Sequence, residues 1–335
     1  MKRVLIKLIA FIAVAGIFTA CDFWAPGIRV YEVKDYSFAT NGLTTVSVAF
    51  EAGSIVFLNT TGPNVEILMT NFVDAGGYSY GAKLLQDNDL FTVTTNNSTI
   101  SITQNKTIEV DYWNVYGVGT HLIVMLPIGT TILTQKVNAV SANVEYFSQN
   151  YVSYIRLAGT TGNIGLINVN AGKVEIETTT GNVDILSVVC GHFEVNGTTG
   201  NILGEQGIID SPLVDIQLTT GNIRIKIKDV DNFGVVTTTG NIETYVESFL
   251  NGSSHGYMEA TSGNIKALFS SAALANLKVD ASVTVGTIGK DASFSSVVKD
   301  NALNLTGREY IAFNGAGSNL VTARMTTGNI TIDDK

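Results

Sequence analysis

Hydrophobic and polar residues alternate along much of this chain, and the alternation returns at regular intervals. The segment 223–228, Ile-Arg-Ile-Lys-Ile-Lys, shows it most clearly. An apolar residue at every second position is typical of a β-strand with one buried face, whereas a helix would repeat every three to four positions. We therefore expect a chain built from short, half-buried strands.

A repeated tetrad divides these strands into units. Its glycines, from 162 to 263, are separated by steps of 19, 19, 21, 19 and 23 residues. The residue two positions after each glycine is always Ile or Val, and a second turn signal falls about midway between tetrads. Thr-Thr-Gly-Asn occurs at 160–163, 179–182, 198–201, 219–222, 238–241 and 326–329, with Thr-Ser-Gly-Asn at 261–264.

This spacing predicts an all-β fold, a parallel β-solenoid with coils of about 19 residues and two short strands per coil. Stacked about 4.8 Å apart, such coils would place Ile and Val in the interior. Glycine permits the backbone conformation of a sharp corner, and stacked Asn amides can form a hydrogen-bonded ladder. An antiparallel sandwich is the rival architecture, but it does not explain the recurrence of the same turn residues.

The organisation expected along the chain has three parts. Residues 1–20 form a signal peptide, 21–44 a spacer, and 45–335 a single solenoid domain. Within that domain, 45–146 are irregular, 147–265 carry the regular repeats, and 266–335 contain an insertion. We expect a polar, glycine-bearing loop at 76–98 and a short helix or lateral excursion at 270–277.

The first 21 residues predict export. Basic residues at 2, 3 and 7 precede an apolar stretch from 8 to 18, which is too short for a comfortable transmembrane helix. Phe18-Thr19-Ala20-Cys21 then resembles the lipobox of bacterial lipoproteins, which implies a lipid on Cys21 and membrane attachment through it. Ordinary cleavage and an uncleaved anchor are the alternatives, and all three place the remaining chain outside the cytoplasm.

Composition narrows the function classes. The net charge of −9 argues against nucleic acid, which needs a basic surface. There are two cysteines, Cys21 and Cys190, so no disulfide framework is expected. The three histidines are far apart, and the common catalytic and phosphate-binding motifs are missing. We expect no cofactor, no metal site and no catalysis, and Cys190 is expected to be a packed core residue.

One set of outward-facing residues, at equivalent positions of successive coils, contains candidate functional carboxylates. Glu175, Glu194 and Asp215 occupy equivalent positions, where carboxylates would lie about 5 Å apart. The simplest interpretation is a solvated acidic stripe relieved by Arg156 and Lys173. A divalent cation site and a carboxylate pair that cleaves glycans are sharper alternatives. The column, taken six residues before each repeat glycine, runs Arg156, Glu175, Glu194, Asp215, Gly234, Tyr257.

These repeats resemble the bacterial β-strand-repeat proteins known as putative adhesins, a domain family of unknown function. The resemblance rests on Gly-Ser-Ile-Val at 53–56, Leu-Pro-Ile-Gly at 126–129, the serial tetrads and the closing segment 326–332. It implies an exported solenoid and supplies no catalytic residues. We therefore expect an adhesin-like binding or scaffold module with an unknown surface, glycan or protein partner. An enzyme acting on extracellular polysaccharide and a self-assembling envelope element are the alternatives.

Overall fold

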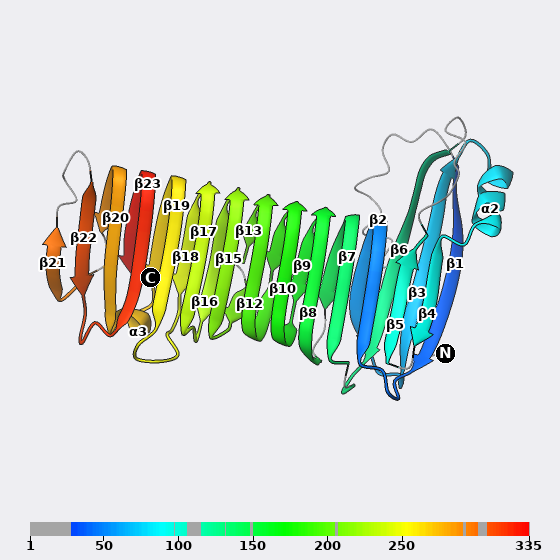
Figure 1. The fold of residues 1–335 in the computed structure, drawn as a ribbon, viewed down its shortest axis with the longest axis horizontal. Helices are drawn as coiled ribbons and strands as arrows, with labels where there is room; N and C mark the ends of the chain where they lie inside the picture. The colour runs from blue at the N-terminus through cyan, green and yellow to red at the C-terminus, as the bar shows by residue number, and fades with distance from the viewer. Residues whose placement is uncertain are drawn as a thin grey trace.

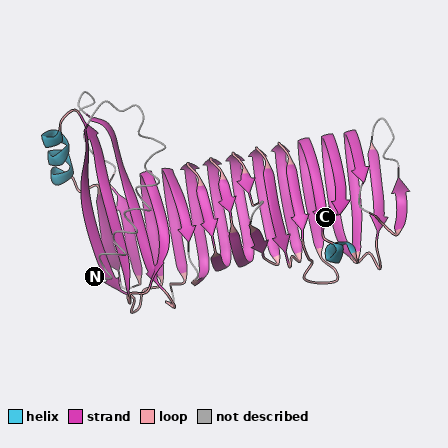
Figure 2. Ribbon diagram, turned by 180° about the vertical axis from the view of Figure 1, so that it is seen from behind, coloured by secondary structure: helices cyan, strands magenta, loops and turns pink. Residues whose placement is uncertain are grey.

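The fold was analysed in a computed structural model, which describes residues 28–96, 98–105, 115–130, 132–147, 150–204, 207–290, 293–300 and 307–334. Strands lie side by side along one long axis, with the N-terminal elements at one end (Figure 1). The two helices of the described ranges lie outside this stack of strands (Figure 2). The all-β prediction is therefore confirmed.

The strands form two rows, because the chain turns at each repeat glycine. The first row contains the segments that precede these glycines, and the longest strands contribute to both rows. In spatial order the first row is β4 (Phe91–Asn96), β5 (Thr99–Gln104), β2 (Thr45–Thr60), β7 (Thr134–Phe147), β8 (Tyr151–Thr161), β10 (Val169–Thr180), β12 (Ser187–Thr199), β15 (Leu213–Thr220), β17 (Asn232–Thr239), β19 (His255–Phe269), β23 (Asn319–Asp334), β20 (Leu277–Lys290), β22 (Arg308–Phe313) and β21 (Ser296–Asp300).

The second row contains the segments that follow the glycines. A short additional strand, β14 (Ile208–Asp210), pairs with the start of β12 and the end of β16. In spatial order the second row is β1 (Ile28–Ala39), β3 (Asn64–Ala75), β6 (Val115–Pro127), the second halves of β2 and β7, β9 (Ile164–Ile167), β11 (Val183–Ile185), β13 (Ile202–Leu203), β16 (Ile223–Lys228), β18 (Ile242–Val246), and the second parts of β19, β23 and β20.

The sheet is mixed, so a uniform parallel solenoid is a wrong description of the whole chain. The pairings from β7 to β19 are parallel. The ends differ, because β1–β3, β3–β6, β4–β5, β20–β22 and β21–β22 pair antiparallel. Coil size also varies, since equivalent Asn residues from 163 to 264 are separated by 19, 21 or 23 positions. Period-two alternation does not distinguish parallel from antiparallel neighbours, which explains the error.

The interior is an aliphatic column, as the repeat predicted. Ile202 pairs with Ile223, and Ile223 with Ile242, on adjacent strands. Each of the three side chains is 1% exposed, whereas Arg224, the next residue along, faces solvent. Burial of each such side chain contributes roughly 1.5–3 kcal/mol. The alternation seen in the sequence is therefore the inward and outward alternation of the stacked strands.

The corners of the stack require glycine for two reasons. Gly200 has a φ of 141°, a backbone conformation that residues with a side chain rarely adopt. A Cβ at Gly200 would also lie 1.9 Å from the carbonyl oxygen of Gly181 on the coil below. Neighbouring coils therefore approach too closely at the corner for any side chain.

Beside the glycines, the asparagines form a continuous ladder. Asn222 accepts the backbone N–H of Asn241 at 3.0 Å and its side-chain amide at 2.9 Å. Thr287 closes one end, because its N–H and hydroxyl both donate to the Asn329 Oδ1 at 3.1 and 2.6 Å. The expected Asn ladder is thus present. Equivalent contacts link Asn143, Asn163, Asn182, Asn201, Asn222, Asn241, Asn264 and Asn329.

The N-terminal end contains two elements that the sequence analysis missed. Residues 28–39, which we assigned to a spacer, form strand β1, paired along its length with β3. Residues 78–87, which we assigned to a polar loop, form helix α2 (Tyr78–Asp87). Gly81 of this helix lies against Val30 and Ala75, so α2 packs closely on β1 and β3. The folded chain therefore begins before residue 45.

At the other end, the chain does not stack in sequence order. After β19 it forms the short helix α3 (Ser271–Leu274), as expected near 270–277, and then continues through β20, β21 and β22. The last strand, β23, returns and lies between β19 and β20, parallel to both. Tyr257 of β19 consequently pairs with Thr322, although the two residues are far apart in the sequence.

Candidate functional site

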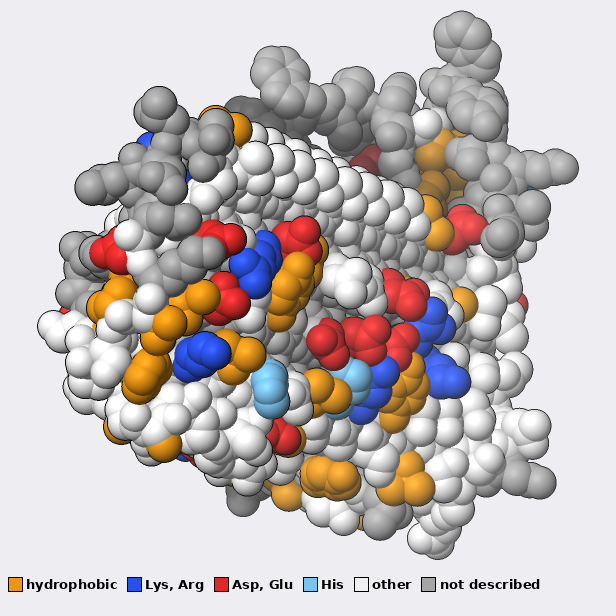
Figure 3. Space-filling view, turned by 60° about the vertical axis from the view of Figure 1, so that its left-hand side comes forward, with side chains coloured by type: hydrophobic (Ala, Val, Ile, Leu, Met, Phe, Trp, Pro, Cys, Tyr) orange, Lys and Arg blue, Asp and Glu red, His pale blue; other side chains and the backbone are white. Residues whose placement is uncertain are grey.

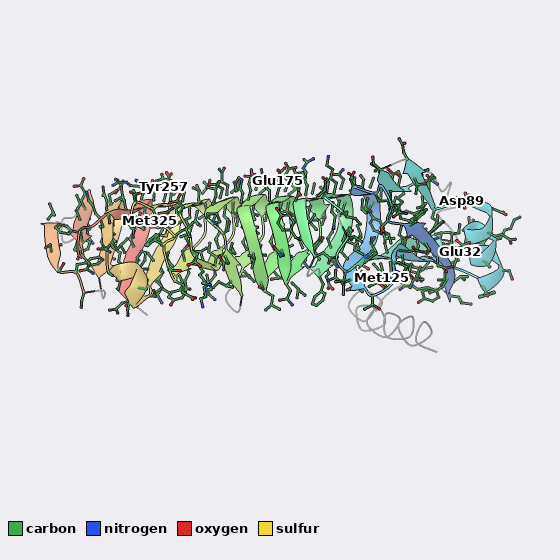
Figure 4. The ribbon with its side chains drawn as sticks, turned by 90° about the horizontal axis from the view of Figure 1, so that it is seen from below. Glu32, Asp89, Met125, Glu175, Tyr257 and Met325 are labelled. Carbon is green, nitrogen blue, oxygen red and sulfur yellow. The ribbon has the colours of Figure 1, made fainter. Side chains whose placement is uncertain are left out.

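The candidate site is the outward surface of the first row from β8 to β19, which we call the charged face. Its middle column is the one expected from the sequence, because Glu175 pairs with Arg156 and with Glu194, and Glu194 pairs with Asp215. Acidic side chains gather in one cluster on this face, with basic and histidine side chains beside them (Figure 3). Glu175 and Tyr257 project from the same side of the stack (Figure 4).

The carboxylates of the column are paired with basic side chains. The Lys173 ammonium lies 3.1 Å from a Glu175 carboxylate oxygen and 2.7 Å from a Glu194 oxygen, so it bridges two coils. The Arg156 guanidinium lies 3.2 Å from Glu175 and 2.7 Å from Glu177. The stripe is therefore a ladder of alternating charges, and Arg156 and Lys173 relieve the repulsion as we expected.

These contacts lower the pKa values of both glutamates. The hydrogen bond from Lys173 holds the pKa of Glu194 below its usual value. Partial burial works to raise the pKa of Glu175, but hydrogen bonds from Tyr154 and Lys173 outweigh it and leave that pKa lowered. A glycan-cleaving pair needs one carboxyl that stays protonated at working pH. Glu175 and Glu194 do not supply such a proton donor.

The geometry also gives no support to a divalent cation site. Within the described ranges, no group of three or more His, Cys, Asp or Glu side chains is placed to hold a metal ion. The space between Glu175 and Glu194, where a cation would neutralise them, is occupied by the Lys173 ammonium. The ion pairs of the protein itself thus perform the neutralisation.

One contact of the charged face was not expected from the sequence. His192 Nε2 lies 3.2 Å from an Asp215 carboxylate oxygen, although the sequence analysis assigned no contact to any histidine. The two residues are 23 positions apart and stand in adjacent columns of adjacent coils. His192 belongs to the column two residues before the Glu194 column. Aligning that column as well would have placed His192 diagonally opposite Asp215.

The column is interrupted at Gly234, which pairs with Asp215 on one side and Tyr257 on the other. Because Gly234 has no side chain, the face carries a depression of about 380 Å³ at this coil. Asn232, His255 and Thr322 also line it. The sequence contained the signal, since Gly234 appears in the aligned column, but we did not single it out.

The second row carries the other charge pattern that the coil alignment shows. Arg224 pairs with Glu243 in register, and Glu243 pairs with Lys266. The Arg224 guanidinium lies 2.8 Å from the Glu243 carboxylate. At an exposed surface such a pair contributes at most about 1 kcal/mol, so it stabilises the register and does not by itself indicate a binding site.

The two cysteines differ in what can be said of them. Cys21, the expected lipid attachment site, lies outside the described residues. Cys190 is buried in the first row, and this burial raises the pKa of its thiol to about 11. A protonated, inaccessible thiol is a poor nucleophile, so Cys190 is a core residue, as expected.

The family follows from a comparison with known proteins. A family model described as Toastrack DUF4097 matches residues 56–333. The chain belongs to the Toastrack family. This match confirms the resemblance drawn from the repeats to a β-strand-repeat family of unknown function. No match is found among curated proteins.

Solved structures provide a second comparison for the Toastrack chain. It is similar to a putative adhesin from Parabacteroides distasonis ATCC 8503, at 11% identity and a TM-score of 0.50, over 92% of this chain and 98% of that one. A putative adhesin from Bacteroides fragilis NCTC 9343 has 12% identity and a TM-score of 0.42, over 90% and 97% of the two chains. A putative lipid binding protein from Parabacteroides distasonis ATCC 8503 has 9% identity and a TM-score of 0.41, over 91% and 98%. At these identities the first likeness shows a shared fold and nothing more.

Neither helix in the described part is long and apolar enough to cross a membrane. The residues of the expected signal peptide, 1–20, lie outside that part.

Proposed function

We propose that this Toastrack chain is an exported cell-envelope protein that binds a surface partner through its charged face. The observation that carries the proposal is the arrangement of that face. Half-exposed charged and polar side chains stand in register on successive coils, held by a rigid stack of paired strands. A fixed, repetitive surface suits recognition of an extended or repetitive partner, as in other solenoids.

The names of the similar structures agree with a binding role. Two of them are called putative adhesins and one a putative lipid binding protein, and none of these three names denotes an enzyme. The lowered pKa values of Glu175 and Glu194 also argue against these two carboxyls as an acid–base pair. We therefore propose binding without catalysis.

We further propose that the chain is anchored through a lipid on Cys21. The support is the basic, apolar and small-residue pattern that ends at this cysteine. The test is metabolic labelling with a fatty-acid analogue in cells that produce the full chain. Label is expected on the wild type and lost in Cys21→Ser, and label that persists in this variant would refute the anchor.

Binding is tested with the chain from residue 22, applied to arrays of cell-wall fragments, glycans and matrix proteins, with a turnover assay on each bound polysaccharide. Retention without product release is the expected result. Product release would favour the enzyme alternative. Absence of retention on all arrays would refute the binding role.

Self-assembly through the ends of the stack is disfavoured by the end strands. The first row terminates in antiparallel pairs, β4–β5 at one end and β22–β21 at the other, and Thr287 closes the Asn ladder. A second copy could not continue the parallel register across such ends without repacking. Sedimentation of the chain from residue 22 is expected to show no end-to-end polymers.

A further inference from the structure

The depression at Gly234 differs from the rest of the charged face in its chemistry. Elsewhere on this face, acidic side chains are held by basic partners on neighbouring coils. At Gly234 the backbone is partly exposed, with Tyr257, 37% exposed, on one side and the Asp215 side chain, 46% exposed, on the other. One Asp215 oxygen contacts His192. The face is hollowed beside its acidic cluster (Figure 3).

The lining groups define what can be recognised there. Asp215 accepts hydrogen bonds, Asn232 both donates and accepts, and the His255 imidazole and Thr322 hydroxyl add further groups of either kind. The Tyr257 hydroxyl donates to Glu259 on its own strand, which fixes the direction of the ring. The ring can thus serve as an apolar platform with hydrogen-bonding groups around it.

Two features favour a small ring over a peptide strand as the occupant. The strands on both sides of the depression, β15 and β19, are paired along their length with β17, so no strand edge is open for an added peptide strand. A volume of about 380 Å³ is at the low end of ligand sites, roughly 300–1,000 Å³. The site suits one compact, hydroxyl-rich ring.

We propose that the depression around Gly234 is a carbohydrate-binding subsite that holds one pyranose unit of a glycan. The sugar ring would lie beside the Tyr257 ring, with its hydroxyls bonded to Asp215 and Asn232. The Asp215 carboxylate in the lining favours a neutral or amino sugar over an acidic one. This inference rests on the proposed binding function and specifies its ligand class.

The test uses the full-length chain, purified in detergent. The probes are cellotetraose, maltotetraose and tetra-N-acetylchitotetraose, with tetragalacturonic acid as the acidic probe. Saturation-transfer NMR and calorimetric titration are expected to show binding of at least one neutral or amino-sugar probe, and at least tenfold weaker binding of tetragalacturonic acid. Absence of binding by all three at millimolar concentration would overturn the proposal, as would equal or tighter binding of the acidic probe.

Two variants locate the site, and a third is a matched control. Gly234→Gln should fill the depression and weaken binding at least tenfold. The fold should tolerate the new side chain, because a Cβ at this position meets only an Asp215 oxygen at 3.2 Å, which can move. Tyr257→Ala removes the platform and should do the same. Gly165→Gln adds the same side chain on the second row, where a Cβ meets only Glu145 at 3.7 Å, and should leave binding unchanged.

Thermal unfolding of each variant shows whether it is folded. If Tyr257→Ala does not fold, the binding measured for Gly234→Gln alone tests the subsite. Binding that is equal in the wild type and Gly234→Gln would overturn the subsite. The same variants applied to the cell-wall and matrix arrays separate this inference from the proposed function. Retention that Gly234→Gln leaves intact overturns the subsite alone, whereas absence of retention by the wild type overturns both.

Discussion

Replacing the corner glycine Gly162 by alanine should destabilise the stack by several kcal/mol. Gly162 has a φ of 124°, and a conformation of this kind costs an alanine about 1–3 kcal/mol. The new Cβ would also lie 2.1 Å from the Ala142 carbonyl oxygen. To relieve this overlap the two coils must separate at the corner, which weakens the hydrogen bonds from Val144 N–H to Asn163 O at 2.8 Å and from Asn163 N–H to Asn143 Oδ1 at 2.9 Å.

Each of these two hydrogen bonds contributes about 0.5–1.5 kcal/mol, so the total expected loss is about 2–6 kcal/mol. The control is Gly159→Ala, three residues earlier in strand β8, where an added Cβ meets nothing within 4 Å and φ is not positive. This change should be neutral or stabilise by up to about 1 kcal/mol, because it restricts the unfolded chain. Urea unfolding followed by circular dichroism measures both variants. Equal midpoints for the two would refute the explanation of the corner.

Three further outcomes are expected. Ile223→Ala should lower the free energy of unfolding in urea by about 2–5 kcal/mol, because the Ile223 side chain is 1% exposed. Arg224→Ala at the solvated surface should lower it by at most about 1 kcal/mol. Similar losses for the two variants would contradict the register. The hydrogen bond from Lys173 keeps the pKa of Glu194 in the folded state below its value in the unfolded chain, which is about 4.3. The stability that this hydrogen bond provides is therefore present above the unfolded pKa and is lost as pH falls through the folded pKa. Unfolding midpoints of Glu194→Gln should therefore decline less on acidification below about pH 4.5 than those of the wild type, and parallel declines would contradict the pairing. With Cys21→Ser as background, Cys190 should react with a thiol reagent at pH 8 only after denaturation, since burial raises its pKa to about 11, and fast labelling of the native protein would count against its burial.

The repeat region was predictable because its determinants are local and recur at stacked positions. Gly200 and Asn201 each have one conformational or hydrogen-bonding role per coil, so equal spacing in the sequence becomes contact in space. The ends were not predictable in this way. Strand β1 carries the same alternation as a parallel strand would, and its antiparallel partner β3 is determined by tertiary packing. Helix α2 has no side-chain N-cap, so the usual signal for a helix start is missing.

The candidate site was partly predictable for the same reason. Alignment on the tetrads placed Glu175, Glu194 and Asp215 in one column, and the structure has them in register. It did not indicate that Lys173 bridges two coils or that His192 reaches Asp215, because both contacts run diagonally between columns. Alignment of the neighbouring column, two residues further back, would have placed these side chains within reach, but side-chain length and rotamer decide whether such contacts form.

The position of β23 between β19 and β20 imposes an order on how the protein can be made. A ribosome releases the chain from its N-terminus, and early coils can fold while later ones are still being synthesised. The open edge of β19 must nevertheless wait for residues 319–334, which emerge after β20, β21 and β22. Until then β20, β21 and β22 have no neighbour to join them to the stack. A chain that ended before residue 319 would therefore expose a long unpaired edge on β19, which favours aggregation and proteolysis.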